Sequence, residues 1–142
     1  MDGSIEERLR GSAPSAFEGE GVLFAYLFGS HAGGRPHARS DVDVAVYLDP
    51  SVSPADFLKV RLRLAQAIAR AARLPDVEVI VLNEAPLPLA GRVIRNRRVL
   101  YSTDEPARVR YESRTFREFV DFDRHAREID RALLRATAEG RR

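Results

Sequence analysis

The chain has 142 residues, with 23 lysines and arginines against 21 aspartates and glutamates, and it contains no cysteine. This is the length of one ordinary domain, and the absence of cysteine excludes disulfides and thiolate metal sites. A formal net charge of +2 is too small to indicate a nucleic-acid binder, so direct nucleic-acid binding is not expected. Basic residues outnumber acidic ones only after residue 90, by 14 to 9. We therefore expect this part of the chain to contact an acidic partner.

No segment is apolar enough to span a bilayer, because the longest apolar run has only seven residues, 22–28. The N-terminus also lacks the apolar region of a signal peptide. The sequence therefore predicts a cytoplasmic protein that does not associate with a membrane.

The first half of the chain predicts two helices and two strands. A short helix is expected at 4–10, followed by a loop rich in glycine, serine and proline up to residue 21. The apolar run 22–28 predicts a buried strand, and the β-branched run 41–48 predicts a second one after a polar loop.

A longer helix is expected to begin at Ser53 and Pro54 and to run to about residue 73. Apolar residues at helical spacing predict which face of this helix lies in the core. That stripe comprises Leu58, Leu62, Ala65, Ile68 and Ala72.

The second half predicts a third strand at 77–82, a short helix at 88–95 and a small strand at 99–101. From residue 104 an uninterrupted amphipathic pattern predicts one long helix, or two helices broken near 121–123. The aromatic stripe within it is expected to lie in the core or against a partner protein. It consists of Phe116, Phe119 and Phe122.

These elements predict an α+β fold, with a small mixed sheet flanked by helices and a long C-terminal helix or helix pair. Residues 1–20 are expected to form an N-terminal extension, 21–103 the core, and 104–140 a helical segment of the same domain.

Two carboxylates lie close together at the start of the second predicted strand. Since side chains alternate along a strand, Asp41 and Asp43 project from the same face with their Cα atoms roughly 6.5–7 Å apart. A hard divalent cation relieves their repulsion, because carboxylate oxygens are its preferred ligands. Two such ions can clamp a phosphoryl group during its displacement.

The turn Gly29-Ser30 supplies a complementary phosphate site. Glycine allows the backbone to approach a ligand closely, and the serine hydroxyl and adjacent N–H groups can bind phosphate oxygens. Phosphate held beside metal-bound carboxylates is most of what nucleotidyl transfer requires.

Gly29-Ser30, a ten-residue spacer and Asp41-Val42-Asp43 resemble the signature of the polymerase-β-like nucleotidyltransferase superfamily. The segments LFGSHAGGRPHARSDVDVAVYLD, VEVIVLNEAP and VIRNRRVLY are similar to its minimal branch, the MNT-domain proteins. These are often the antitoxins of HEPN-domain ribonuclease toxins. The resemblance covers about residues 20–135.

The resemblance implies that Asp41 and Asp43 bind two Mg²⁺ ions and that a third carboxylate lies on the next strand. Glu78 stands where the family usually has aspartate, and Asp76 is the other candidate.

The resemblance also implies that Gly29 and Ser30 hold the triphosphate of ATP. Arg39 and Ser40, just before the acidic pair, are assigned to the same nucleotide. For Arg35 and Arg39 the sequence leaves open whether they neutralise the triphosphate or are simply solvated.

The resemblance thus implies an antitoxin that transfers AMP from MgATP to a tyrosine of a cognate HEPN toxin, with Glu78 aligning or deprotonating the acceptor hydroxyl. Two alternatives remain open. One is nucleotidylation of a small molecule such as an aminoglycoside, and the other is a non-catalytic module that neutralises its partner by occlusion.

Overall fold

The computed structural model describes residues 4–29 and 42–140 of the chain, the last two by their backbone only. The expected α+β class is confirmed, with four strands and four α-helices in this part of the chain. In chain order these are α1 (Ile5–Phe17), β1 (Val22–Phe28), β2 (Val42–Leu48), α2 (Phe57–Ala72), β3 (Val77–Val81), α3 (Leu87–Arg95), β4 (Arg98–Ser102) and α4 (Glu105–Gly140).

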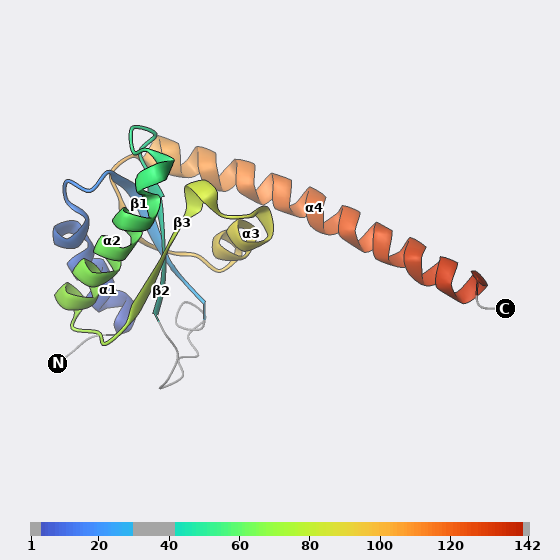
Figure 1. Ribbon diagram of the computed structural model, residues 1–142, viewed down its shortest axis with the longest axis horizontal. Coiled ribbons are helices and arrows are strands. Elements are labelled where there is room, and N and C mark those ends of the chain that lie inside the picture. The colour runs from blue at the N-terminus through green and yellow to red at the C-terminus, as the bar shows by residue number, and fades with distance from the viewer. Residues whose placement is uncertain (1–3, 30–41, 141–142) are drawn as a thin grey trace.

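The strands form one mixed sheet in the order β3-β2-β1-β4. β1 pairs antiparallel with β2 and β4, whereas β2 and β3 run parallel. Helices α1 and α2 cover one face, while α3 and the first part of α4 cover the other (Figure 1). The rest of α4 projects away from this body (Figure 1).

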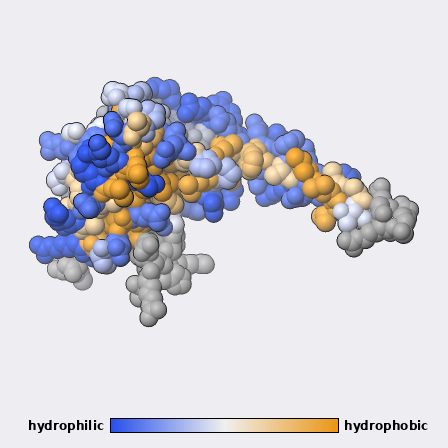
Figure 2. All heavy atoms as spheres, in the orientation of Figure 1, coloured by the Kyte–Doolittle hydropathy of each residue, from blue (hydrophilic) through white to orange (hydrophobic). Residues whose placement is uncertain are grey.

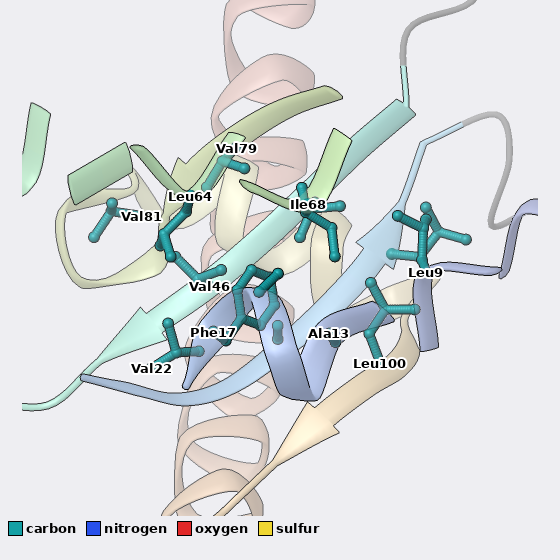
Figure 3. Packing of buried hydrophobic residues seen from close by; sticks show 14 of the residues in the cluster. Leu9, Ala13, Phe17, Val22, Val46, Leu64, Ile68, Val79, Val81 and Leu100 are labelled. Carbon is teal, nitrogen blue, oxygen red and sulfur yellow. The ribbon is translucent and has the colours of Figure 1, made fainter. Parts of the chain in front are cut away.

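The larger core lies between the sheet and the pair α1 and α2. Side chains with almost no exposed surface meet there from all three elements (Figure 3). They include Leu9 and Phe17 of α1, Leu64 and Ile68 of α2, and Val46 of β2. Alternate residues of β2 point into this core, so the residues between them face α3 and α4.

Helix α1 is longer than expected, and the prediction of a loop after residue 10 was wrong. The helix begins at a capping box between Ser4 and Glu7 and continues through Pro14 to Phe17. Ala13 and Phe17 are buried one turn apart. Their burial offsets the unfavourable proline and serine in this segment, which intrinsic helix propensity alone does not capture.

The core-facing stripe predicted for α2 was also partly wrong. Leu58 and Leu62 are 58% and 55% exposed. The observed buried residues are Phe57, Val60, Leu64, Ile68 and Ala72. The sequence carries two overlapping apolar stripes, and only packing on the sheet selects between them.

The long C-terminal helix is unbroken from Glu105 to Gly140, which confirms the first of the two alternatives. Its aromatic stripe divides: Phe119 is buried, but Phe116 and Phe122 are exposed. In the described part of the chain, no helix combines the length and apolar character needed to cross a membrane.

Candidate functional site

Two of the predicted carboxylates lie side by side on neighbouring strands. Asp43 of β2 and Glu78 of β3 are direct partners in the parallel pairing. Their neighbours Val44 and Val79 point into the core under α1 and α2, so both carboxylates project from the opposite face. Neighbouring strands are about 4.8 Å apart, which is close enough for both side chains to reach one ligand.

Gly29, at the end of β1, lies next to Asp43. It follows β1 directly, and the last residue of β1, Phe28, pairs with Asp43. Gly29 has a φ of +81°, and a Cβ built on it would lie 2.6 Å from Oδ2 of Asp43. Only glycine fits here, because any side chain would be strained and would also displace the carboxylate. The structure therefore joins Gly29, Asp43 and Glu78 in one site.

The site lies near the edge of the sheet that β3 forms. Glu78 is exposed on the edge strand β3, whereas Asp43 is half-buried one strand further in. A hollow of about 420 Å³ runs along this edge, and its walls include Glu78, Asp76 and, from α2, Arg61 and Leu62. Asp76 precedes the first residue of β3, so it shares the hollow with Glu78 but not the strand pairing with Asp43.

Four of the predicted site residues lie outside the described part of the chain. These are Ser30, Arg39, Ser40 and Asp41. Among residues 4–29 and 42–140 no group of three metal-binding side chains occurs. The described donors are nevertheless of the right kind, because Asp43 and Glu78 offer carboxylate oxygens and the glycine leaves room beside one of them.

A second polar cluster, which the sequence did not indicate, joins α4 to the sheet. Glu112 of α4 accepts a hydrogen bond from the Tyr26 hydroxyl at 2.7 Å and another from Arg108 at 2.6 Å. It also pairs with Arg97 at 3.0 Å. Burial, reinforced by Glu112, raises the pKa of Tyr26 well above its usual value. The only sequence signal was a charged residue on the face of α4 that otherwise packs on the sheet.

The Glu112 cluster stabilises the fold and is not a further catalytic centre. Its carboxylate is matched by two guanidinium groups and a phenol, which leaves little capacity for another ligand. It attaches the first half of α4 to β1 and to the connection between α3 and β4, and so keeps α4 packed on this face of the sheet.

The family described as "Polymerase beta, Nucleotidyltransferase" matches residues 15–106. The chain belongs to this family. The matched segment contains Gly29, Asp43 and Glu78, and the expectation of a nucleotidyltransferase is confirmed at the level of the family. A search of curated protein sequences finds no match.

Solved structures with the same fold include chains of toxin–antitoxin complexes. One complex contains AMP-PNP; its chain is 21% identical, with a TM-score of 0.63, and the alignment covers 91% of the present chain and 98% of the other. Another is the tri-AMPylated Shewanella oneidensis HEPN toxin in complex with MNT antitoxin, at 19% identity, with the same TM-score and coverage. A third, the MntA–HepT complex, gives 19% identity and a TM-score of 0.62, with 90% and 98% covered.

Proposed function

We propose that the protein is an MNT-type antitoxin that transfers AMP from ATP to a tyrosine hydroxyl of a cognate HEPN toxin and thereby neutralises it. The observation that carries this proposal is the convergence of Gly29, Asp43 and Glu78 in a nucleotidyltransferase fold. The similar structures support the choice of partner and nucleotide, since they include an AMPylated HEPN toxin and a complex with an ATP analogue.

In this proposal Asp41, Asp43 and Glu78 hold two Mg²⁺ ions. Their oxygen donors suit a hard divalent cation. When bound, the metal neutralises charge on the phosphates. Gly29, Ser30, Arg39 and Ser40 are proposed to bind the triphosphate, and at Gly29 the absence of a side chain leaves the backbone free to approach it.

The acceptor hydroxyl is proposed to approach at the exposed edge of the sheet, from the face on which Asp43 and Glu78 project. Glu78 is exposed at this edge and can align the hydroxyl or take up its proton. The hydroxyl oxygen attacks the α-phosphorus of ATP, the bond to the β-phosphate breaks, and pyrophosphate leaves. The product is a tyrosine–AMP phosphodiester; the hydroxyl proton goes to Glu78 where Glu78 acts as the base, and to solvent where Glu78 only aligns the hydroxyl.

The test combines the purified chain, its cognate HEPN toxin, ATP and magnesium, followed by intact-mass measurement. We expect a mass increase of the toxin by AMP, and a decrease in rate of at least ~100-fold for Asp43→Asn and for Glu78→Gln. Glu84→Gln is the matched control, because it removes a carboxylate three residues beyond the end of β3. Asp76→Asn tests the other candidate for the third carboxylate.

The same variants also decide three questions: which residue is the third carboxylate, whether neutralisation needs catalysis, and what the acceptor is. If Asp76→Asn abolishes transfer while Glu78→Gln does not, Asp76 is the third carboxylate. Absence of any mass increase with every nucleotide would refute the catalytic claim. If Asp43→Asn still neutralises the toxin, neutralisation occurs by occlusion instead. Transfer to an aminoglycoside but not to the toxin would support the small-molecule alternative.

A further inference from the structure

The second half of α4 has an apolar stripe that nothing in the described chain covers. Packing of α4 on the body ends at Phe119, which lies so close to Gly91 of α3 that a Cβ there would overlap its ring. Beyond this contact, residues 120–138 are exposed or half-exposed. Figure 2 shows hydrophobic side chains continuing along one side of the projecting helix.

The stripe has the spacing of a coiled-coil seam. Its apolar residues follow one another at alternating steps of three and four, which is the pattern of two helices that pack side by side. They are Phe119, Phe122, Ala126, Ile129, Leu133 and Ala136. The seam is about 27 Å long at the rise of an α-helix.

A helix of this length is not expected to stand alone. Isolated helices gain little stability from propensity, and most helical stability in proteins comes from packing of the apolar face. Leu133 is 60% exposed, and Phe122 and Ile129 are also well exposed. The exposed apolar residues therefore leave a face of α4 available for packing against another helix.

The charges beside the seam indicate the chemistry of that helix. Glu118 borders the seam on one side, and Asp123 and Asp130 border it on the other. Arg124 and Arg131 lie on the opposite face. Asp123 forms an ion pair with Arg127 at 3.1 Å, but such an exposed pair four residues apart adds little and leaves the carboxylate accessible.

The expectation that the chain after residue 90 meets an acidic partner stays a prediction, but the basic surplus on which it rests does not lie in α4. Helix α4 contains eight arginines and eight acidic residues, so it has no surplus of positive charge. The surplus lies mainly in α3 and the start of β4, at Arg92, Arg95, Arg97 and Arg98.

We propose that the exposed part of the seam, from Phe122 to Ala136, docks an amphipathic α-helix of another protein, one whose apolar stripe is flanked by lysine or arginine. A second copy of this chain fits poorly, because its own acidic flanks would oppose Glu118, Asp123 and Asp130. The identification of this helix as part of the acceptor toxin rests on the proposed function, whereas the chemistry of the seam does not.

The test uses the full chain and two synthetic helical peptides of three heptads with leucine in the seam, one flanked by lysine and the other by glutamate. We expect the lysine-flanked peptide to bind more tightly by at least ~10-fold, with the difference decreasing at high salt. Reversal of charge in Asp123→Lys/Asp130→Lys should invert the preference. Equal binding of both peptides by the unaltered chain would overturn the charge argument.

Two neighbouring leucines provide a matched control for the seam itself. Leu133 lies in the seam and Leu134 lies outside it, and both are exposed, at 60% and 70%, so neither change should unfold the chain. Leu133→Asp should weaken peptide binding at least ~10-fold, whereas Leu134→Asp should leave it within ~2-fold. Equal effects of both substitutions would refute the seam.

Self-association and catalysis are measured separately. Sedimentation of the chain alone should show no dimer through the seam. A dimer that dissociates in Leu133→Asp would mean that a second copy occupies the seam and would overturn the proposal. Peptide binding requires neither ATP nor Asp43, so loss of AMP transfer with retained binding would contradict only the proposed function. Loss of binding with retained transfer would contradict only the docking proposal.

Discussion

The sheet face under α3 and α4 has two unlike ends. At one end Asp43 and Glu78 lie side by side with Gly29 against them. At the other end the rings of Phe24 and Tyr47 are stacked with centroids 4.9 Å apart, and Tyr111 of α4 packs on both. About four residues of β2, roughly 13 Å, separate the two ends.

The difference separates the stabilising aromatic contacts from the proposed catalytic carboxylates on one surface. The aromatic end buries large apolar rings and stabilises the fold. The carboxylate end brings two acidic groups together on adjacent strands, which is unfavourable for folding alone. Substitutions at one end should therefore change stability, and those at the other end should change activity.

The largest effect is expected at the aromatic end. Phe24 has no exposed surface, so Phe24→Ala should lower the free energy of unfolding by about 3–5 kcal/mol. Urea unfolding measures the change, and the exposed Phe116 provides the control Phe116→Ala, expected within about 0.5 kcal/mol. At a temperature where Phe24→Ala remains folded, AMP transfer should be unchanged; its loss would show that the two ends are coupled.

The contact between α3 and α4 should be the next most sensitive. A Cβ on Gly91 would lie 2.0 Å from a ring carbon of Phe119, so Gly91→Ala should cost about 1–3 kcal/mol through overpacking. In α1, a Cβ on Gly11 meets no described atom within 4 Å, and Gly11→Ala should be neutral or stabilising by up to about 1 kcal/mol. Similar thermal shifts for both variants would contradict the close approach.

At the carboxylate end we expect a smaller effect that falls on activity. Gly29→Ala and Gly19→Ala both place alanine at a positive φ, +81° and +73°, and should have similar costs in stability. Only at Gly29 would the new Cβ meet the Asp43 carboxylate. AMP transfer should fall about 10-fold or more in Gly29→Ala and stay unchanged in Gly19→Ala. Equal rates would show that the position of Asp43 is not critical.

The smallest effect is a dependence of stability on acid pH at the start of α4, beside the aromatic end. Hydrogen bonds from Arg108 hold the pKa of Glu105 at about 2, below its ordinary 4.5. A carboxyl group whose pKa is lowered by folding stabilises the protein above its unfolded pKa, and this stabilisation is lost as the pH falls from 4.5 towards 2.

Glu105→Gln should therefore flatten the change of melting temperature with pH in that acid window and have little effect at pH 7. Glu128→Gln, on the exposed half of α4, removes one carboxylate as a control. An unchanged pH profile in Glu105→Gln would show that the Arg108 contact does not influence folding.

Much of the fold was predictable because the strands are short, apolar and bounded by turn residues. The prediction 22–28 matches β1. Ser53 and Pro54 begin a short 3₁₀ turn, Pro54–Asp56, and α2 starts after it at Phe57, three residues later than predicted. Asp43 could be singled out because it lies two residues after Asp41 on the same face of the predicted strand, and Glu78 because of its position in the family resemblance. The structure places these two residues as partners on neighbouring strands. The roles of all the predicted site residues stay predictions, and Ser30, Arg39, Ser40 and Asp41 also lie outside the described residues.

Other features depend on packing that a single sequence does not encode locally. Leu58 and Leu62 have the same hydropathy as buried leucines, and only the docking of α2 on the sheet leaves them exposed. The partnership of Tyr26 with Glu112 spans 86 residues, so no local pattern announces it. The contact of Gly91 with Phe119 likewise appears only when two helices are brought together.

Helix α1 has a practical consequence for any attempt to shorten the protein. The family match begins at residue 15, inside this helix. A version that starts there would lose Leu9 and Ala13 from the larger core, and also Arg8, whose guanidinium donates to the carbonyl oxygens of Ala72 and Arg73 at the end of α2. The part of the sheet that α1 covers would then be open to solvent, so expression trials and domain fusions should keep the chain from Ser4 onward.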